Sequence, residues 1–160
     1  MCIRDRFGDV ELTVHCAAEL LKRAPEYDYL IAPEAKAIPL LYEMARQSGA
    51  EKYFLARKGA KAYMTGVFEV EVRSITTMHI QKLVIDTADA ELIKGKKILI
   101  VDDVISTGES LHAMEELVKR AGGIIAGKMA VLAEGDAKDR DDIITLAPLP
   151  LFNADGTVKA

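Results

Sequence analysis

The sequence predicts an α/β fold in which a mainly parallel sheet carries helices on both faces, with one antiparallel excursion. Short apolar runs typical of buried strands alternate along the chain with amphipathic stretches of helical spacing. The chain has 160 residues, of which 50% are hydrophobic, and this is the size and apolar content of one ordinary domain. We therefore expect a single domain over residues 1–160.

The first half of the chain predicts two helices and two strands. Apolar residues recur at helical spacing from Val10 to Leu21, behind Asp9 as a plausible helix cap and with Pro25 just past the end. A strand, a helix ended by a glycine and a second strand are expected next, over residues 28–32, 40–49 and 52–57. The stretch that follows has no periodicity and is expected to be a loop.

The second half begins with the excursion and then returns to the parallel pattern. Apolar and charged residues alternate over 67–72 and less cleanly over 79–85, which is typical of a half-exposed antiparallel pair. A buried strand, a helix ended by two glycines and two further strands are expected over residues 96–103, 110–123, 124–134 and 142–149. Because sheets of this kind bind ligands at the carboxyl ends of their strands, the functional loops should gather there.

Charge and cysteine content limit the classes of function. Lys and Arg total 21 against 25 for Asp and Glu, a net charge of −4, so no positive excess exists to bind nucleic acid. Cys2 and Cys16 lack metal-ligand or disulfide spacing, which indicates a reducing compartment. The charged first ten residues do not resemble a signal peptide, and the apolar run ILIV is far shorter than the roughly 20 residues of a membrane span. We expect a cytoplasmic protein without a membrane partner, and assign no function to residues 1–6.

The stretch ILIVDDVISTGES, residues 98–110, places two carboxylates at the end of an apolar run and follows them with hydroxyls and a glycine. A simple turn before a helix would explain an isolated pattern of this kind. A phosphorylated receiver domain also opens with a strand and paired acids, but only 57 residues follow Asp103, too few for the rest of that fold. The third interpretation treats the strand, acid pair, loop and helix as one binding site.

That third interpretation has a physical basis in the two halves of the motif. Backbone N–H groups at the start of a helix point outward, where the helix dipole favours an anion, so STGES can wrap a phosphate monoester. Two carboxylates cannot face that phosphate without repulsion, but they can accept hydrogen bonds from neighbouring sugar hydroxyls. A phosphorylated ribose satisfies both requirements.

The motif IVDDVISTGES resembles the phosphoribosyl-pyrophosphate signature of the type I phosphoribosyltransferases, and the adenine-type members most closely. APEAKAIPL, residues 32–40, resembles their pyrophosphate loop, and ARKGAKAYMTG, residues 56–66, resembles the step into a mobile lid, expected over 59–80. The likeness extends over nearly the whole chain from about residue 9, with a short N-terminal hood. It implies phosphoribosyl pyrophosphate and a nucleobase as ligands, Mg²⁺ as cofactor and a homodimer.

The resemblance also implies roles for individual residues. The catalytic residues would be Asp102, Asp103, Arg57 and Lys58. The substrate-binding residues would be Glu34, Ala35, Lys36, Lys61, Val104, Ile105, Ser106, Thr107, Gly108, Glu109 and Ser110, with the Glu109 side chain turned to solvent. Mg²⁺ is expected to be held through pyrophosphate and ribose oxygens and not by protein ligands directly.

The choice of base has weaker signals. Ser106 stands where hypoxanthine-guanine enzymes carry an aspartate, so adenine or a related aminopurine is the first choice. Orotate enzymes share the Arg57, Lys58 and Lys61 pattern but usually carry a histidine where this chain has Tyr63, so orotate is a lesser alternative. A regulator that binds phosphoribosyl pyrophosphate without catalysis is a further alternative. Candidates to stack on a purine are Phe7 and Phe152, while His79 and His112 are expected to be structural or solvent-facing.

Overall fold

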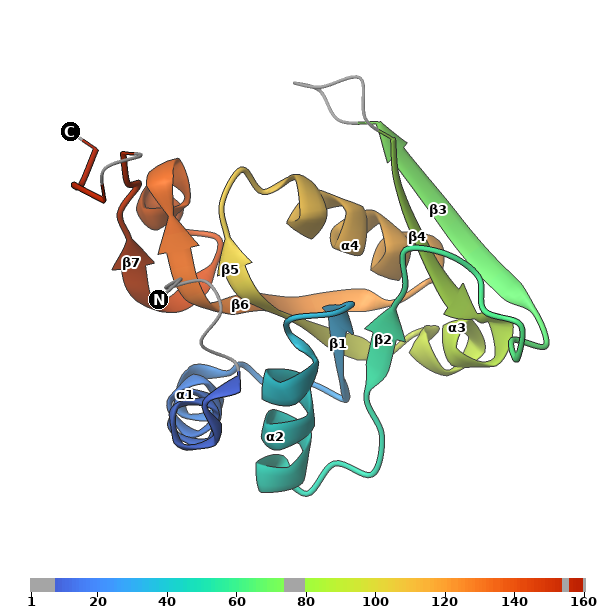
Figure 1. Cartoon of the computed structure of the whole chain (residues 1–160). Helices are drawn as coiled ribbons and strands as arrows, with labels where there is room; N and C mark the ends of the chain where they lie inside the picture. The colour runs from blue at the N-terminus through green and yellow to red at the C-terminus, as the bar shows by residue number, and fades with distance from the viewer. Residues whose placement is uncertain (1–7, 74–79, 154–155, 160) are drawn as a thin grey trace.

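The computed structural model describes residues 8–73, 80–153 and 156–159. Its centre is a sheet of five parallel strands in the order β2-β1-β5-β6-β7 (Figure 1). The strands are β1 (Tyr29–Pro33), β2 (Phe54–Ala56), β5 (Lys97–Ile105), β6 (Ile124–Glu134) and β7 (Ile144–Leu149). The expected mainly parallel α/β sheet is confirmed.

Two helices, α1 (Val10–Arg23) and α2 (Ile38–Ser48), cover one face of this sheet (Figure 1). Asp9 caps α1 as predicted, because its side chain accepts a 3.0 Å hydrogen bond from the N–H of Leu12. Gly49 ends α2 with a φ of 72°, a left-handed conformation that glycine adopts without strain. Leu20, Leu30 and Leu40 are fully buried in the core beneath these helices.

The opposite face carries α4 (Glu109–Arg120), the short helix α3 (Thr87–Ile93) and an antiparallel hairpin of β3 (Val67–Arg73) and β4 (Ile80–Asp86). In β3 the alternate residues Phe68, Val70 and Val72 pack on this core, as the sequence pattern predicted. Helices therefore lie on both faces, as expected. In the parts of the chain that the structure describes, no helix is long and apolar enough to span a bilayer.

Two short helices were not predicted, and two predicted element ends are corrected. The seven residues 87–93 are too few for a helical period to predict α3, whose N-terminus is capped by Asp86 through the N–H of Ala88. The 3-10 helix η2 (Gly135–Asp139) was also not predicted. Strand β5 runs to Ile105 and not to residue 103, because Val104 and Ile105 still pair with β6. Helix α4 ends at Arg120, before the two glycines, with Gly122 at a φ of 79°.

The connection between sheet and hairpin lies at Arg57. Its backbone N–H donates to the carbonyl of Val84 at 2.8 Å, and the N–H of Val84 donates back at 2.7 Å. The chain leaves β1 in one direction to reach β2, and later returns on the other side of β1 as β5. The carboxyl ends of β1 and β5 therefore form a topological switch point, which is where open α/β sheets bind ligands.

Candidate functional site

A pocket of about 540 Å³ opens at this switch point. Three regions far apart in the sequence meet there: the turn after β1, the acidic end of β5 and the inner side of the hairpin. The lining residues are Pro33, Glu34, Ala35, Lys36, Lys58, Ile80, Lys82, Leu83, Asp102, Asp103, Val104 and Ser110. Carboxylates and lysines thus share one cavity.

The acid pair stands within β5, two residues before its end. Asp102 is 9% exposed, and its Oδ1 accepts a 2.8 Å hydrogen bond from the N–H of Asp103. Burial raises the pKa of Asp102 well above its ordinary value, and the hydrogen-bonded, like-charged carboxyl of Asp103 raises it further. The Asp103 amide and the Lys58 ammonium act in the opposite direction. The Asp102 carboxyl is therefore held at a cost that a hydrogen-bonding ligand or a cation would reduce.

The loop between β5 and α4 encloses a second, smaller hollow of about 90 Å³ that adjoins the first. It is lined by Asp102, Val104, Ile105, Ser106, Thr107, Gly108, Ser110 and Leu111, of which Asp102, Val104 and Ser110 also line the larger pocket. Gly108 precedes α4 with a φ of 82°. Glycine suits this position because a side chain would be strained there. The hollow thus lies at the N-terminus of a helix, where the dipole favours anions.

Glu34 organises the turn after β1 and the start of the predicted lid. Its carboxylate accepts from Nη1 of Arg57 at 3.2 Å and from the backbone N–H of Lys58 at 3.4 Å, and Nζ of Lys61 lies 3.7 Å away. The peptide bond between Glu34 and Ala35 is cis. The guanidinium of Arg57 also lies over the ring of Tyr63 at 5.7 Å. Arg57 and Lys61 therefore contact Glu34, while Lys58 faces the pocket.

Most of the predicted site residues come together in this structure. All of the residues proposed in the two loops line one of the two cavities except Glu109, which is partly buried and has its N–H 3.5 Å from Oγ1 of Thr107. Arg57 and Lys61 line neither cavity and reach the site through Glu34.

The predictions made outside the two loops have separate outcomes. Phe152 is 43% exposed and lines neither cavity, and His112 is exposed on α4. Phe7, His79, the N-terminal six residues and part of the expected lid lie outside the described residues.

Sequence reasoning missed the contribution of β4. Ile80 and Lys82 project from alternate positions of this strand and line the pocket together with Leu83. Nζ of Lys82 lies 2.6 Å from the Glu69 carboxylate on β3. The alternation along 79–85 showed that one side of the strand differs from the other, but it could not show that this side faces the acid pair.

A metal would find few protein ligands here. Within residues 8–73, 80–153 and 156–159 there is no cluster of three or more His, Cys, Asp or Glu side chains able to hold an ion. The two aspartates supply oxygen ligands of the kind Mg²⁺ prefers, and Mg²⁺ characteristically takes its remaining ligands from water and substrate phosphates. The residues present fit a Mg²⁺ ion that is bound largely through a ligand.

The fold and the pocket define an α/β domain in which an acid pair and a loop suited to bind an anion lie at a switch point of the parallel sheet. The family model described as "Phosphoribosyl transferase domain" matches residues 11–147. The chain therefore belongs to the phosphoribosyltransferase family.

Curated relatives agree with this assignment. An adenine phosphoribosyltransferase of Thermotoga maritima is 34% identical over 110 residues, which are 68% of this chain and 59% of that protein. One from Kosmotoga olearia is 31% identical over 134 residues, or 78% of this chain and 69% of that protein. An orotate phosphoribosyltransferase of Caldanaerobacter subterraneus is 29% identical over 111 residues, covering 69% of this chain and 47% of its own. The chain spans about 60% of the length of the first of these relatives.

Solved structures share the fold. Adenine phosphoribosyltransferase from Thermoanaerobacter pseudethanolicus superposes with a TM-score of 0.71 at 22% identity, covering 89% of this chain and 83% of that one. The Giardia lamblia enzyme, complexed with 9-deazaadenine, gives 0.70 at 16% identity, covering 91% and 83%. At these identities the likeness concerns the fold alone.

Proposed function

We propose that this protein is a purine-salvage phosphoribosyltransferase that joins adenine to phosphoribosyl pyrophosphate, releasing adenosine monophosphate and pyrophosphate. The observation that carries the proposal is the adjacency of the two cavities. The acid pair lines the larger pocket together with three lysines, and Asp102 also lines the adjoining hollow at the helix N-terminal loop. A ribose with a monoester at one end and a pyrophosphate at the other has this same sequence of groups.

We assign the parts of the ligand accordingly. Asp102 and Asp103 accept hydrogen bonds from the ribose hydroxyls, and the loop over residues 106–110 binds the 5′-monoester. The pyrophosphate lies against the turn at residues 34–36, with Lys36, Lys58 and Lys82 as the nearby cations. Arg57 and Lys61, tied to Glu34, belong to the lid entry. These assignments rest on the lining of the pocket and on the family resemblance.

In this transfer reaction the protein contributes mainly by stabilising charge and by positioning the reactants, and not by forming covalent bonds to them. The bond between C1 of the ribose and the pyrophosphate oxygen breaks, and the electron pair leaves with pyrophosphate. A ring nitrogen of the base forms the new bond to C1, and the base loses one N–H proton, which the departing pyrophosphate or water accepts. Lysines around the leaving group stabilise its growing negative charge, and the aspartates hold the sugar while C1 becomes cationic. Asp102 and Asp103 are the residues that would hold a Mg²⁺ ion together with oxygens of the ligand, and the ion would supply further neutralisation of the leaving group's charge.

Adenine is the first choice of base. The support is Ser106, small and neutral beside Thr107, together with the names of the Thermotoga and Kosmotoga relatives. A yeast relative of the same fold is described as complexed with adenine and an imino-altritol bisphosphate. Orotate is the second candidate, because one relative carries that name and because the Arg57, Lys58 and Lys61 pattern is present here.

The test is a turnover assay with phosphoribosyl pyrophosphate, Mg²⁺ and a panel of adenine, hypoxanthine, guanine and orotate. Formation of adenosine monophosphate and pyrophosphate with adenine alone is the expected result. Product with orotate alone would move the assignment to the second candidate. Tight binding of phosphoribosyl pyrophosphate without product from any base would instead indicate a regulator and contradict the proposed reaction.

We further propose that the protein is a cytoplasmic homodimer. The cytoplasmic location is supported by the low cysteine content, in which Cys16 is buried and forms no disulfide. The homodimer is supported by the family resemblance. Light scattering of the purified chain is expected to give twice the 17.5 kDa mass of one chain, and the mass of a single chain would contradict the dimer.

A further inference from the structure

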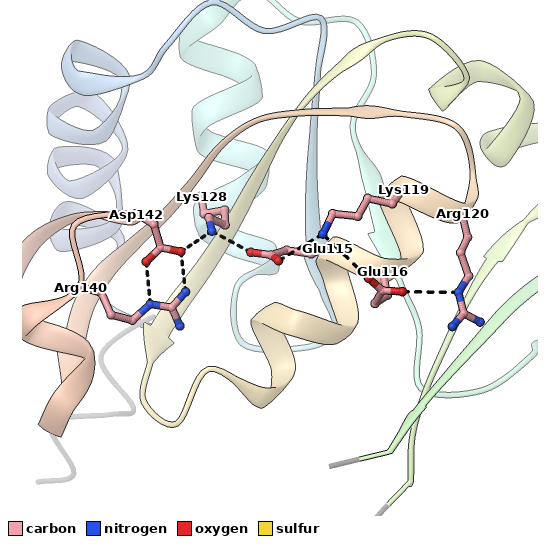
Figure 2. A network of polar contacts seen from close by, with 7 residues as sticks. All are labelled: Glu115, Glu116, Lys119, Arg120, Lys128, Arg140 and Asp142. Carbon is pink, nitrogen blue, oxygen red and sulfur yellow. Dashed lines mark hydrogen bonds and ion pairs between the residues drawn. The ribbon is translucent and has the colours of Figure 1, made fainter. Parts of the chain in front are cut away.

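A chain of ion pairs runs along α4 and ends beside the loop that precedes it. Figure 2 shows the carboxylate of Asp142 between the guanidinium of Arg140 and the amino group of Lys128. Arg140 donates to Asp142 through Nε at 2.8 Å and Nη2 at 2.7 Å, a bidentate pair. Lys128 also contacts Glu115 of α4 at 2.8 Å. Arg140 is thus anchored, through Asp142 and Lys128, to α4, the helix that Gly108 precedes.

The third nitrogen of this guanidinium lies at the loop. A Cβ atom placed on Gly108 would be 2.6 Å from Nη1 of Arg140 and 3.9 Å from its Cζ. Among the residues that the structure describes, the side-chain hydrogen bonds of Arg140 use Nε and Nη2 only. Nη1 therefore stands next to the smallest residue of the loop with its donors available.

The loop needs a positive charge that its own residues do not provide. Residues 104–110 contain no Lys or Arg, and Glu109 and the acid pair add negative charge close by. A phosphate monoester carries between one and two negative charges near neutral pH, so backbone N–H groups alone would hold it against local repulsion. Arg140 is a cation adjacent to Gly108, on an element that the loop motif does not include.

We propose that Arg140 is a further binding residue of the monoester subsite, with Nη1 as a hydrogen-bond donor and counter-charge to the phosphate held by the loop at 106–110. This inference rests on the proposed function, which places a 5′-phosphate in that loop. Asp142 positions the guanidinium by occupying Nε and Nη2. The carboxylates near Arg140, those of Asp142 and Glu115, are themselves neutralised in part by Lys128.

The network makes this arrangement rigid. Hydrogen bonds from Arg140, and then from Lys128, hold the pKa of Asp142 well below its usual range, so the anchor stays ionised at physiological pH. The Lys128 and Glu115 side chains are each only 16% exposed, which limits screening by solvent at that end of the chain of pairs. A guanidinium fixed in this way loses little conformational freedom when a phosphate arrives.

The experiment is a calorimetric titration of ribose 5-phosphate, and separately of pyrophosphate, into the wild type, Arg140→Gln and Arg120→Gln. Arg120 is the matched control, because it also pairs with a carboxylate, that of Glu116 at 3.6 Å, but lies in the last turn of α4, at the end away from the loop (Figure 2). We expect Arg140→Gln to bind ribose 5-phosphate about 10- to 100-fold more weakly, while its pyrophosphate affinity and both affinities of Arg120→Gln stay within about 2-fold.

A pH series separates a charge role from a structural one. The second ionisation of a phosphate monoester lies near pH 6, so wild-type affinity should rise between about pH 5 and 7.5 as the ligand gains charge. In Arg140→Gln this rise should shrink, whereas a variant that merely distorts the loop would lose the same factor at every pH. A constant factor across the series would overturn the proposal.

The remaining outcomes are also decisive. Unchanged binding of ribose 5-phosphate by Arg140→Gln would remove Arg140 from the subsite while leaving the proposed function intact. Failure of the wild type to bind ribose 5-phosphate would contradict the proposed function, and this inference with it. If circular dichroism shows that Arg140→Gln does not fold, Arg140→Lys is titrated instead. Lysine cannot contact Asp142 and the ligand through one planar fork, so a loss of about 3-fold or more is expected, and unchanged affinity would overturn the proposal.

Discussion

The backbone N–H of Asp103 donates a 2.8 Å hydrogen bond to Oδ1 of Asp102, so the two adjacent carboxylates are not equivalent. Successive side chains of a strand point to opposite faces, and here Asp102 is 9% exposed while Asp103 is half-buried. The pKa of Asp102 is raised, first by burial and then by Asp103. We expect the two residues to respond differently to substitution.

Asp102→Asn should stabilise the ligand-free protein at pH 8 by more than about 1 kcal/mol. The unfolded chain ionises this carboxyl near its ordinary value of about 4, whereas the folded protein keeps the proton to a higher pH. Folding stability therefore falls as pH rises from about 4 through the raised pKa, and asparagine removes this loss. Urea unfolding at pH 4.5, 6 and 8 measures it, with exposed Asp136→Asn as the control. A difference that is constant over this range would contradict the raised pKa.

Asp103→Asn should mainly affect ligand binding and turnover. Asp103 lines the pocket beside Asp102, and an amide accepts fewer hydrogen bonds from sugar hydroxyls than a carboxylate does. We expect kcat/KM for adenine and phosphoribosyl pyrophosphate to fall by about 10- to 100-fold, corresponding to one or two hydrogen bonds with a charged partner. Steady-state kinetics with Asp136→Asn alongside tests this. Wild-type kinetics in Asp103→Asn would exclude Asp103 from the site.

Lys82→Ala should weaken pyrophosphate binding without weakening ribose 5-phosphate binding. Lys82 is part of the pocket wall that faces the turn after β1, and it is 42% exposed, so we expect a loss of about 3- to 10-fold that decreases with added salt. Lys22→Ala, which breaks a comparable surface pair on α1, is the control. Glu69→Gln removes the ion pair of Lys82 but keeps the Lys82 cation, so it should not weaken pyrophosphate binding. If Glu69→Gln loses as much affinity as Lys82→Ala, hairpin structure and not charge is responsible.

Gly108→Ala should affect the phosphate loop through two separate effects. A φ of 82° strains any residue with a Cβ, at about 1 kcal/mol, and the added methyl would lie 2.6 Å from Nη1 of Arg140. Gly49→Ala is the matched control, because its φ is 72° but no atom lies within 4 Å of the new methyl. Both variants should lose about 1 kcal/mol of stability in urea unfolding. Only Gly108→Ala should lose ribose 5-phosphate affinity, by about 10-fold, and equal affinities in the two variants would contradict a close contact at the loop.

The sequence predicted the elements whose signal is local and repeated. Helix α1 has an apolar stripe and an Asp9 cap, and β5 has a continuous apolar run, so both were predicted to within two residues. The short α3 escaped notice because seven residues hold too little periodicity to distinguish a helix from a loop. The last two residues of β5 were assigned to the loop because their strand character depends on pairing with Leu132 and Ala133 of β6, which are far away in the sequence.

The candidate site divides in the same way. Asp102 through Ser110 form one contiguous motif, so the sequence by itself determined that the acid pair adjoins the loop, and it predicted the kind of ligand that they suit. The meeting of Lys82 with the acid pair, and of Arg140 with Gly108, was decided only by the tertiary structure. The physical reason is that spacing along a chain records which side chains share a face of one element. Contacts between elements depend instead on the strand order and on how helices and hairpin pack against the sheet.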